Sequence, residues 1–130
     1  MKTRVLLVFL LAIFCSFVHA QDVFTNVKNA IKAADADQLS KYFNQNLDVN
    51  IEGNLNTFSK AQAAFAIGEF FKAHPPVDFA IVHKGSSQGG LQFAIGKYTS
   101  GQDTYTVLVR VKESASARLV HEISFVKEKK

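Results

Sequence analysis

The pattern of hydrophobic and polar residues predicts a helical start to the chain. From Asp22 to Ala34 the hydrophobic residues recur at steps of three and four, which is typical of an amphipathic helix. Asp35 is followed three residues later by Gln38, as in a capping box, and this predicts a second, short helix. Leu39, Tyr42 and Phe43 would lie on one side of that helix.

A small hairpin and a longer helix are expected next. Residues alternate between hydrophobic and polar from Leu47 to Ile51, Gly53-Asn54 is a turn signal, and Leu55–Phe58 would pair back as a second strand. Ser59 and Gln62 complete a capping box, so a helix is predicted from Ser59 to Ala73 before Pro75 and Pro76 end it. Its hydrophobic stripe consists of Ala64, Ile67, Phe70 and Phe71.

The remainder of the chain alternates with the period of a strand. Short turns, the longest predicted over Gly85–Gly90, separate four such segments and indicate an antiparallel meander. A sheet with one buried face needs a covering helix, and Ser59–Ala73 is the candidate. The residues that share a face by alternation are Val77, Phe79, Ile81 and His83, then Tyr105, Val107, Val109 and Val111, then Leu119, His121, Ile123 and Phe125, while Leu91, Phe93 and Ile95 alternate with Gln92, Ala94 and Gly96.

This order of elements resembles that of the nuclear-transport-factor-two-like superfamily. Within it, the chain is similar to a family of small exported Bacteroidetes proteins known as a domain of unknown function, from about Val27 to Val126. The resemblance implies an α+β fold in which a cone-like, curved antiparallel sheet wraps a long helix after two N-terminal helices. It supplies no activity. The residues that carry it are Phe70-Phe71, Pro75-Pro76, Phe79, His83–Ser87, Ala94–Gly96 and Tyr105.

The first 20 residues have the order of a secretory signal: a positive start, an uncharged run from Val5 to Val18, and a cleavage site after Ala20. The run of 14 residues is shorter than the ~20 that a spanning helix needs, so no membrane anchor is predicted. Cleavage leaves one domain, residues 21–130, without cysteine and with 13 basic against 11 acidic residues. Because the basic residues are scattered, a nucleic-acid partner is not expected.

Candidate chemistry is sparse, and no catalytic, cofactor-binding or metal-binding residue is predicted. His83 and His121 could act as general bases, or they could be half-buried histidines bonded to neighbouring carbonyls. Enzymes of the ketosteroid-isomerase type, in the same superfamily, use a pocket carboxylate and a phenol or acid. The acidic candidates here are Asp48, Glu52, Asp78 and Glu122, and the phenols are Tyr42, Tyr98 and Tyr105. None of them stands in a local motif of such enzymes.

Two interpretations of the interior remain open. An opening between helix and sheet would accept a small apolar ligand. Its predicted lining is Tyr42, Phe71, Phe79, His83, Phe93, Tyr105 and His121. Alternatively, the interior is a closed core filled by Phe43, Phe65, Phe70, Phe71, Phe79, Phe93 and Phe125.

The opposite face of the sheet is the second candidate region. By alternation it would carry Lys97, Arg110, Glu122 and Ser124 together with Val82, Leu108 and Val120, a mixture that suits a partner. Superfamily members often form dimers through this sheet. The leading hypothesis is therefore an exported, non-catalytic module that binds a small apolar ligand or a protein. The alternatives are a small cone-fold isomerase, lyase or hydrolase, and a structural homodimer.

Overall fold

The structure is a computed structural model that describes residues 22–114 and 117–129. The predicted export signal lies outside these residues. The helices of the described part are α2 (Val23–Lys32), α3 (Ala36–Ser40) and α4 (Lys60–Ala73). The strands are β1 (Phe43–Ile51), β2 (Asn54–Ser59), β3 (Asp78–Ser87), β4 (Leu91–Ser100), β5 (Asp103–Ser114) and β6 (Ala117–Lys127).

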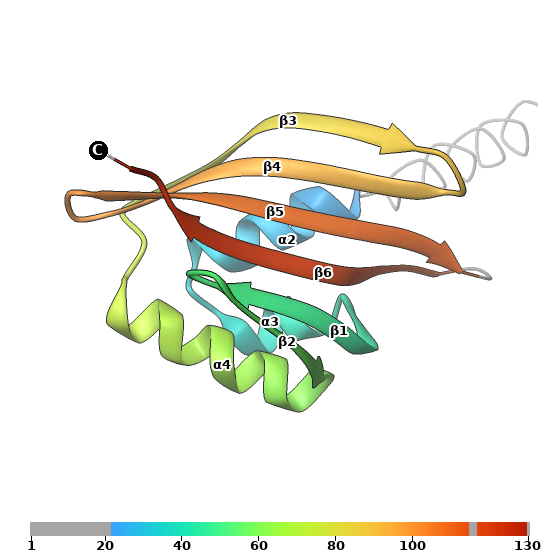
Figure 1. Cartoon of the computed structure of the whole chain (residues 1–130), viewed down its shortest axis with the longest axis horizontal. Coiled ribbons are helices and arrows are strands. Elements are labelled where there is room, and N and C mark those ends of the chain that lie inside the picture. The colour runs from blue at the N-terminus through green and yellow to red at the C-terminus, as the bar shows by residue number, and fades with distance from the viewer. Residues whose placement is uncertain (1–21, 115–116, 130) are drawn as a thin grey trace, which may run out of the picture.

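The strands form one curved, six-stranded sheet in the order β2-β1-β6-β5-β4-β3 (Figure 1). β3 to β6 pair antiparallel in chain order, which confirms the predicted meander, and β1 and β2 form the predicted hairpin. The hairpin joins the meander through a parallel pairing of β1 with β6. Alternation alone did not predict this pairing, because the pattern specifies faces and not neighbours. The α+β class is confirmed.

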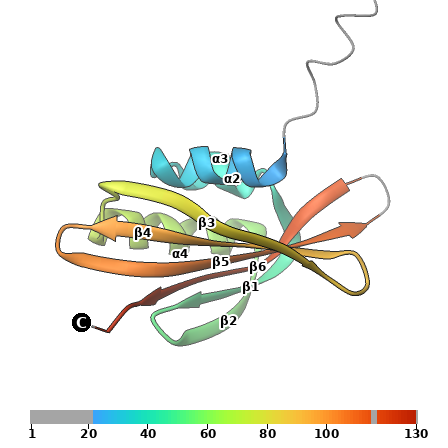
Figure 2. The ribbon, with the colours of Figure 1, turned by 90° about the horizontal axis from the view of Figure 1, so that it is seen from above.

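The helices begin where the sequence places caps. The Asp22 and Asp35 side chains accept hydrogen bonds from backbone N–H groups of the first turns of α2 and α3. At α4 the Ser59 side chain and the Gln62 side chain bond to each other's backbone N–H, so the predicted capping box is complete. α2 lies near β3, α4 lies beside the β1–β2 hairpin, and the short α3 packs between α2 and α4 (Figures 1 and 2).

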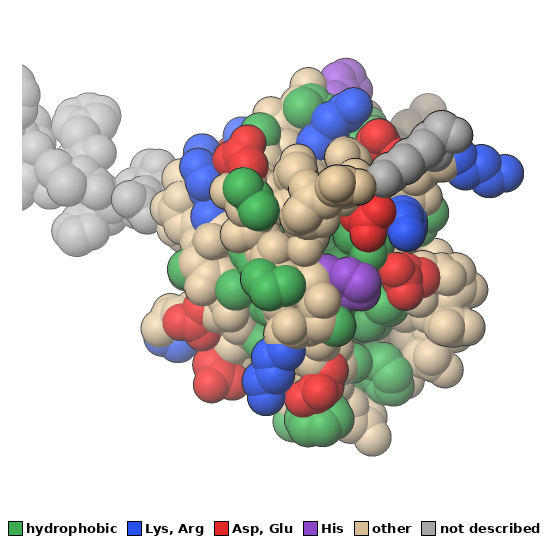
Figure 3. Space-filling view, turned by 90° about the vertical axis from the view of Figure 1, so that its left-hand side faces the viewer, with side chains coloured by type: hydrophobic (Ala, Val, Ile, Leu, Met, Phe, Trp, Pro, Cys, Tyr) green, Lys and Arg blue, Asp and Glu red, His purple; other side chains and the backbone are tan. Residues whose placement is uncertain are grey.

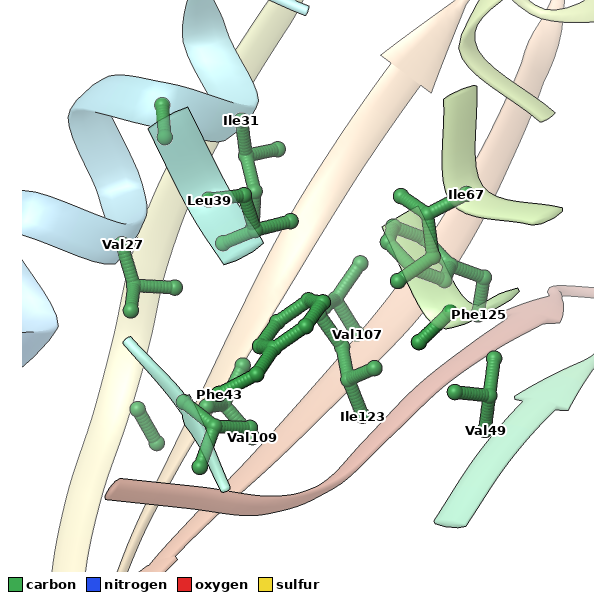
Figure 4. Packing of buried hydrophobic residues seen from close by; sticks show 14 of the residues in the cluster. Val27, Ile31, Leu39, Phe43, Val49, Ile67, Val107, Val109, Ile123 and Phe125 are labelled. Carbon is green, nitrogen blue, oxygen red and sulfur yellow. The ribbon is translucent and has the colours of Figure 1, made fainter. Parts of the chain in front are cut away.

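The helices and one face of the sheet, the inner face, enclose a single hydrophobic core (Figure 4). Burial of this apolar surface is the main stabilising contribution to a domain of this size. The largest side chains that are almost completely buried are Tyr98, Tyr105, Phe43, Phe79, Phe125, Ile31, Leu39, Ile67 and Ile123.

Two β-bulges overturn part of the predicted alternation. In β3 the register shifts between Ile81 and His83, so His83 pairs with Ile95 and leaves the face of Phe79. In β6, Arg110 pairs with Glu122 and Val111 with Val120, which makes His121 the extra residue. The prediction that Val120 lies on the outer face is therefore wrong, since its side chain is fully buried in the core. An extra residue reverses the alternation beyond it.

Four further local predictions are wrong. Phe65 is 72% exposed on the solvent side of α4, and Val77 is 75% exposed before β3 begins. β3 continues through Gly85 to Ser87, so the predicted long turn is shorter. In β4 the core-facing residues are Ala94, Gly96 and Tyr98, and Phe93 therefore lies on the outer face.

Candidate functional site

The seven residues predicted to line an interior pocket do not share one. Phe71, Phe79 and Tyr105 are buried in the core, and Tyr42 packs against its edge. His83 and Phe93 lie on the outer face, with ring centroids 5.8 Å apart. His121 stands on the β6 bulge, and its Nε2 is buried without a hydrogen-bond partner among the described residues. Tyr42, Phe71, Phe79 and Phe93 line four different surface grooves.

Aromatic rings fill the interior at the end of α4. The Phe70 ring centroid lies 4.6 Å from that of Phe125, 5.1 Å from Tyr105 and 5.5 Å from Tyr98. These separations are those of rings in direct contact. Phe70, Tyr98, Tyr105 and Phe125 are each 5% exposed or less, so this region corresponds to the packed core and not to an open cone.

A polar cluster caps this aromatic core, and we call Glu52, His74 and Tyr105 the end cluster. The Tyr105 hydroxyl donates to the Glu52 Oε1 at 3.2 Å and lies 3.2 Å from the His74 Nδ1. A phenol has one hydrogen, which is directed at the Glu52 carboxylate, and the His74 Nδ1 lies within hydrogen-bond distance of the same phenol oxygen. The Tyr105 hydroxyl therefore connects the Glu52 carboxylate to the His74 imidazole.

The three members come from distant parts of the chain. Glu52 occupies the β1–β2 turn with a φ of 55°, held there by its N–H bond to the Phe125 carbonyl at 2.8 Å. His74 is the C-cap of α4, and its carbonyl accepts a hydrogen bond from the Tyr98 hydroxyl. Tyr105 lies near the start of β5. The end cluster therefore links a turn, a helix end and the sheet, at the end of the molecule seen in Figure 3.

Burial, followed by the hydrogen bond to Glu52, raises the pKa of Tyr105 to about 12. Burial likewise raises the pKa of Tyr98. Both phenols therefore stay protonated at neutral pH, as hydrogen-bond donors. A carboxylate, a phenol and an imidazole in contact have the groups of an acid–base site. Of five grooves on the described part of the chain, however, none is lined by Glu52, His74 or Tyr105.

The sequence anticipated part of this cluster. Glu52 and Tyr105 were both candidates for a carboxylate–phenol pair, although no spacing joined them. His74 was not among the predicted site residues, because no periodicity or motif connects it to Glu52 or Tyr105. The available signal was its position immediately before Pro75, where a helix end places its backbone and side chain next to the sheet.

The outer face carries a groove of about 390 Å³ that the helices leave uncovered. We call it the outer groove; it is lined by Ser87, Leu91, Gln92, Phe93, Ile95, Leu108 and Arg110. The Phe93 ring lies directly over Gly85, where an added Cβ would come within 2.5 Å of it. Hydrophobic side chains form the floor, since Phe93, Ile95 and Leu108 are only half-buried there.

Charged side chains of both signs surround the outer groove. The Arg110 Nε lies 3.7 Å from a Glu122 carboxylate oxygen, and the Lys97 Nζ lies 3.7 Å from Glu128. Ser124, on the same face by register, is 8% exposed. The structure thus places Lys97, Arg110, Glu122 and Ser124 together on the face where alternation predicted them.

The described residues contain no group of three or more His, Cys, Asp or Glu side chains that could hold a metal ion. Within the same part of the chain, no helix has both the length and the hydrophobicity needed to span a bilayer.

The fold defines the class of protein: an α+β domain of the nuclear-transport-factor-two-like and cystatin-like type. A solved NTF2-like protein from Shewanella baltica matches with a TM-score of 0.63 at 13% identity, over 83% of this chain and 90% of that one. A cystatin-like domain from Nostoc punctiforme matches with a TM-score of 0.65 at 9% identity, over 83% of this chain and 74% of that one.

The particular family is DUF4783, described as a domain of unknown function, whose model matches residues 24–126. The chain belongs to this family. A solved DUF4783 protein from Bacteroides ovatus has a TM-score of 0.75 and 25% identity, over 81% of this chain and 94% of that one. None of the curated proteins matches the chain.

Proposed function

We propose that the protein is an exported, non-catalytic binding module whose interface is the outer face of its sheet. One observation carries this proposal: the interior is filled by aromatic rings, whereas the outer groove exposes Phe93, Ile95 and Leu108. Val82 and Val126, 57% and 42% exposed, add to the uncovered hydrophobic surface of β3 and β6. A hydrophobic centre with a polar rim is the usual composition of a protein–protein interface.

The proposed partner is a second copy of the chain. The rim contains two cations, Lys97 and Arg110, and two anions, Glu122 and Glu128, so its net charge is close to zero. In a two-fold arrangement the same patch meets itself, and each arginine of one copy can approach the glutamate of the other. Two copies of this face therefore meet without net repulsion.

Export rests on the N-terminal pattern, residues 1–20, with its positive start, uncharged run and small residue before the cleavage site. The purified mature chain, residues 21–130, is consequently the form to test. A periplasmic or extracellular location is checked separately, by fractionating cells of the source organism and sequencing the N-terminus of the recovered protein. Recovery in the cytoplasm with residues 1–20 intact would contradict export.

Native mass spectrometry of the mature chain tests the interface directly. We expect a dimer for the natural sequence and a monomer for Leu108→Asp, which places a carboxylate in the centre of the outer groove. Phe65→Asp is the matched control, because Phe65 is 72% exposed on the solvent side of α4, away from this face. That variant should remain dimeric.

A charge exchange sharpens the test. Arg110→Glu and Glu122→Arg should each weaken the dimer, and the double variant should recover it, since opposite charges again face each other. A monomeric natural chain at high concentration would refute the proposed partner. A monomer that carries a bound small apolar molecule would instead support the outer groove as a ligand site.

A further inference from the structure

A second groove, independent of the outer face, runs between α2 and β3. It has a volume of about 350 Å³ and is lined by Thr25, Lys28, Lys32, Asp78, Phe79, Ala80, Ile81 and Lys84. Four consecutive β3 residues, Asp78 to Ile81, take part, although alternate side chains of a strand point to opposite faces. The groove therefore follows the backbone edge of β3.

Among the described residues this edge is free, because β3 is the last strand of the sheet that they form. A free edge presents unpaired N–H and C=O groups to the solvent. Figures 1 and 2 show β3 at the margin of the sheet with α2 alongside it. The groove thus combines backbone donors and acceptors on one wall with helix side chains on the other.

The helix wall is positively charged. Lys28 and Lys32 are one helical turn apart and line the groove together. Lys28 is half-buried, so its stem lies along the groove. On the described part of the chain no carboxylate lies within ion-pair distance of Lys28 or Lys32. Two ammonium groups are therefore available to a ligand, opposed by Asp78 at one end.

The β3 bulge extends this positive surface. Because the register shifts between Ile81 and His83, Lys84 turns to the side of α2, where its Nζ lies 3.0 Å from the Asp22 Oδ2. Lys84 also lines an adjoining groove of about 320 Å³ together with Arg118. Cationic side chains thus follow the edge of β3 from one groove into the next.

We propose that this edge binds an acidic peptide segment in extended conformation, which adds to β3 as a further strand. The peptide backbone would pair with the free N–H and C=O groups, and its carboxylates would face Lys28 and Lys32. A phosphate or an acidic polysaccharide could bind the lysines, but it lacks the regular alternation of N–H and C=O groups that pairs with a strand edge. The same lysines disfavour a second β3 edge through repulsion between like charges.

The edge of β2, at the opposite end of the sheet, lacks the charges that favour an acidic peptide at β3. β2 (Asn54–Ser59) carries no charged residue and no flanking pair of lysines that line a groove with it. An acidic strand therefore has no electrostatic preference for β2. Because β2 is the other terminal strand of the sheet, backbone pairing alone would not distinguish the two edges.

Fluorescence anisotropy on the mature chain tests the proposal with a labelled short peptide of alternating glutamate and threonine. We expect binding that the double variant Lys28→Gln/Lys32→Gln weakens by about three- to tenfold. Lys41→Gln/Lys60→Gln removes the same charge from exposed sites elsewhere and should leave the affinity unchanged. Circular dichroism checks that both variants fold.

The backbone contribution is tested with a second peptide in which proline replaces the threonines. Proline has no N–H and should abolish binding if the peptide adds as a strand. Equal binding of the two peptides, or an equal loss in the Lys41→Gln/Lys60→Gln control, would each overturn the proposal. Native mass spectrometry of the same variants reports the dimer separately, so either inference can fail alone.

Discussion

The two faces of the sheet are built from the same strands, yet they have opposite properties. Adjacent β5 residues illustrate this: Tyr105 points to the inner face and is fully buried, whereas Thr106 points to the outer face and is half-buried. Both hydroxyls donate to a glutamate, Tyr105 to Glu52 at 3.2 Å and Thr106 to Glu128 at 3.0 Å. The comparison shows that the covering layer, and not the strand, determines what a residue contributes.

Two glycines that lie under phenylalanine rings show the same difference between the inner and the outer face. Gly96 lies beneath Phe79 on the inner face, and Gly85 lies beneath Phe93 on the outer face. In each case an added Cβ would come within 2.6 Å of the ring. The Phe79 ring is held by the core, whereas the Phe93 ring borders the open outer groove. The same local contact is therefore rigid on one face and adjustable on the other.

The largest expected difference is between two phenylalanine truncations. Phe125→Ala should lower the free energy of unfolding by about 3–5 kcal/mol, because it leaves a cavity between α4 and the sheet. Phe93→Ala should cost about 1 kcal/mol, since the ring is only half-buried. Urea denaturation of both variants measures the difference. Equal losses would show that the outer face is as tightly packed as the inner one.

A smaller difference is expected for the two glycines. Gly96→Ala should destabilise the fold by about 2–3 kcal/mol, because the new methyl group meets both the Phe79 ring and the Ala80 carbonyl. Gly85→Ala should cost less than about 1 kcal/mol, since the Phe93 ring can move toward solvent. Thermal unfolding of the two variants measures this difference. A larger loss of stability in Gly85→Ala than in Gly96→Ala would contradict the distinction between the faces.

The smallest difference concerns the two hydroxyls. Tyr105→Phe should cost about 1–2 kcal/mol, because the half-buried His74 loses its hydrogen-bond partner. Thr106→Val should change the free energy of unfolding by no more than about 0.5 kcal/mol, since water can replace the lost bond. Chemical denaturation at neutral pH measures both values.

Alkaline pH provides the control for Tyr105. Its pKa is raised from 10.0 to about 12 in the folded state, so the protonated phenol favours folding. This contribution is complete below pH 10 and is lost as the pH rises through 12. Stability measured across that interval should fall less steeply in Tyr105→Phe, with the remaining decrease due partly to Tyr98, whose pKa is also raised. An unchanged profile would place Tyr105 outside the end cluster.

Most of the fold could be predicted from local patterns. The capping box at Ser59, the stop at Pro75 and the alternation of Tyr105, Val107 and Val109 each depend on residues close in sequence, and the structure confirms them. The errors at His83, His121 and Val120 share one cause. A bulge inserts one residue into the ladder, and it is specified by the partner strand rather than by the strand's own pattern.

The candidate sites were harder to predict from the sequence than the fold was. The end cluster unites Glu52, His74 and Tyr105 through contacts between residues 31 and 53 positions apart, so no motif could indicate it. The α2–β3 groove required both the edge position of β3 and the bulge that turns Lys84 toward Asp22. Neither feature can be predicted from the periodicity of hydrophobic residues along the chain.

The sequence by itself determined the α+β class, the helix ends and the pairing of consecutive strands, because caps, periodicity and turns act over a few residues. The tertiary structure alone decided the parallel contact of β1 with β6, the face on which Phe93 lies, and the closure of the interior by aromatic rings. These features depend on which surfaces meet, and that is settled by packing between elements far apart in the chain.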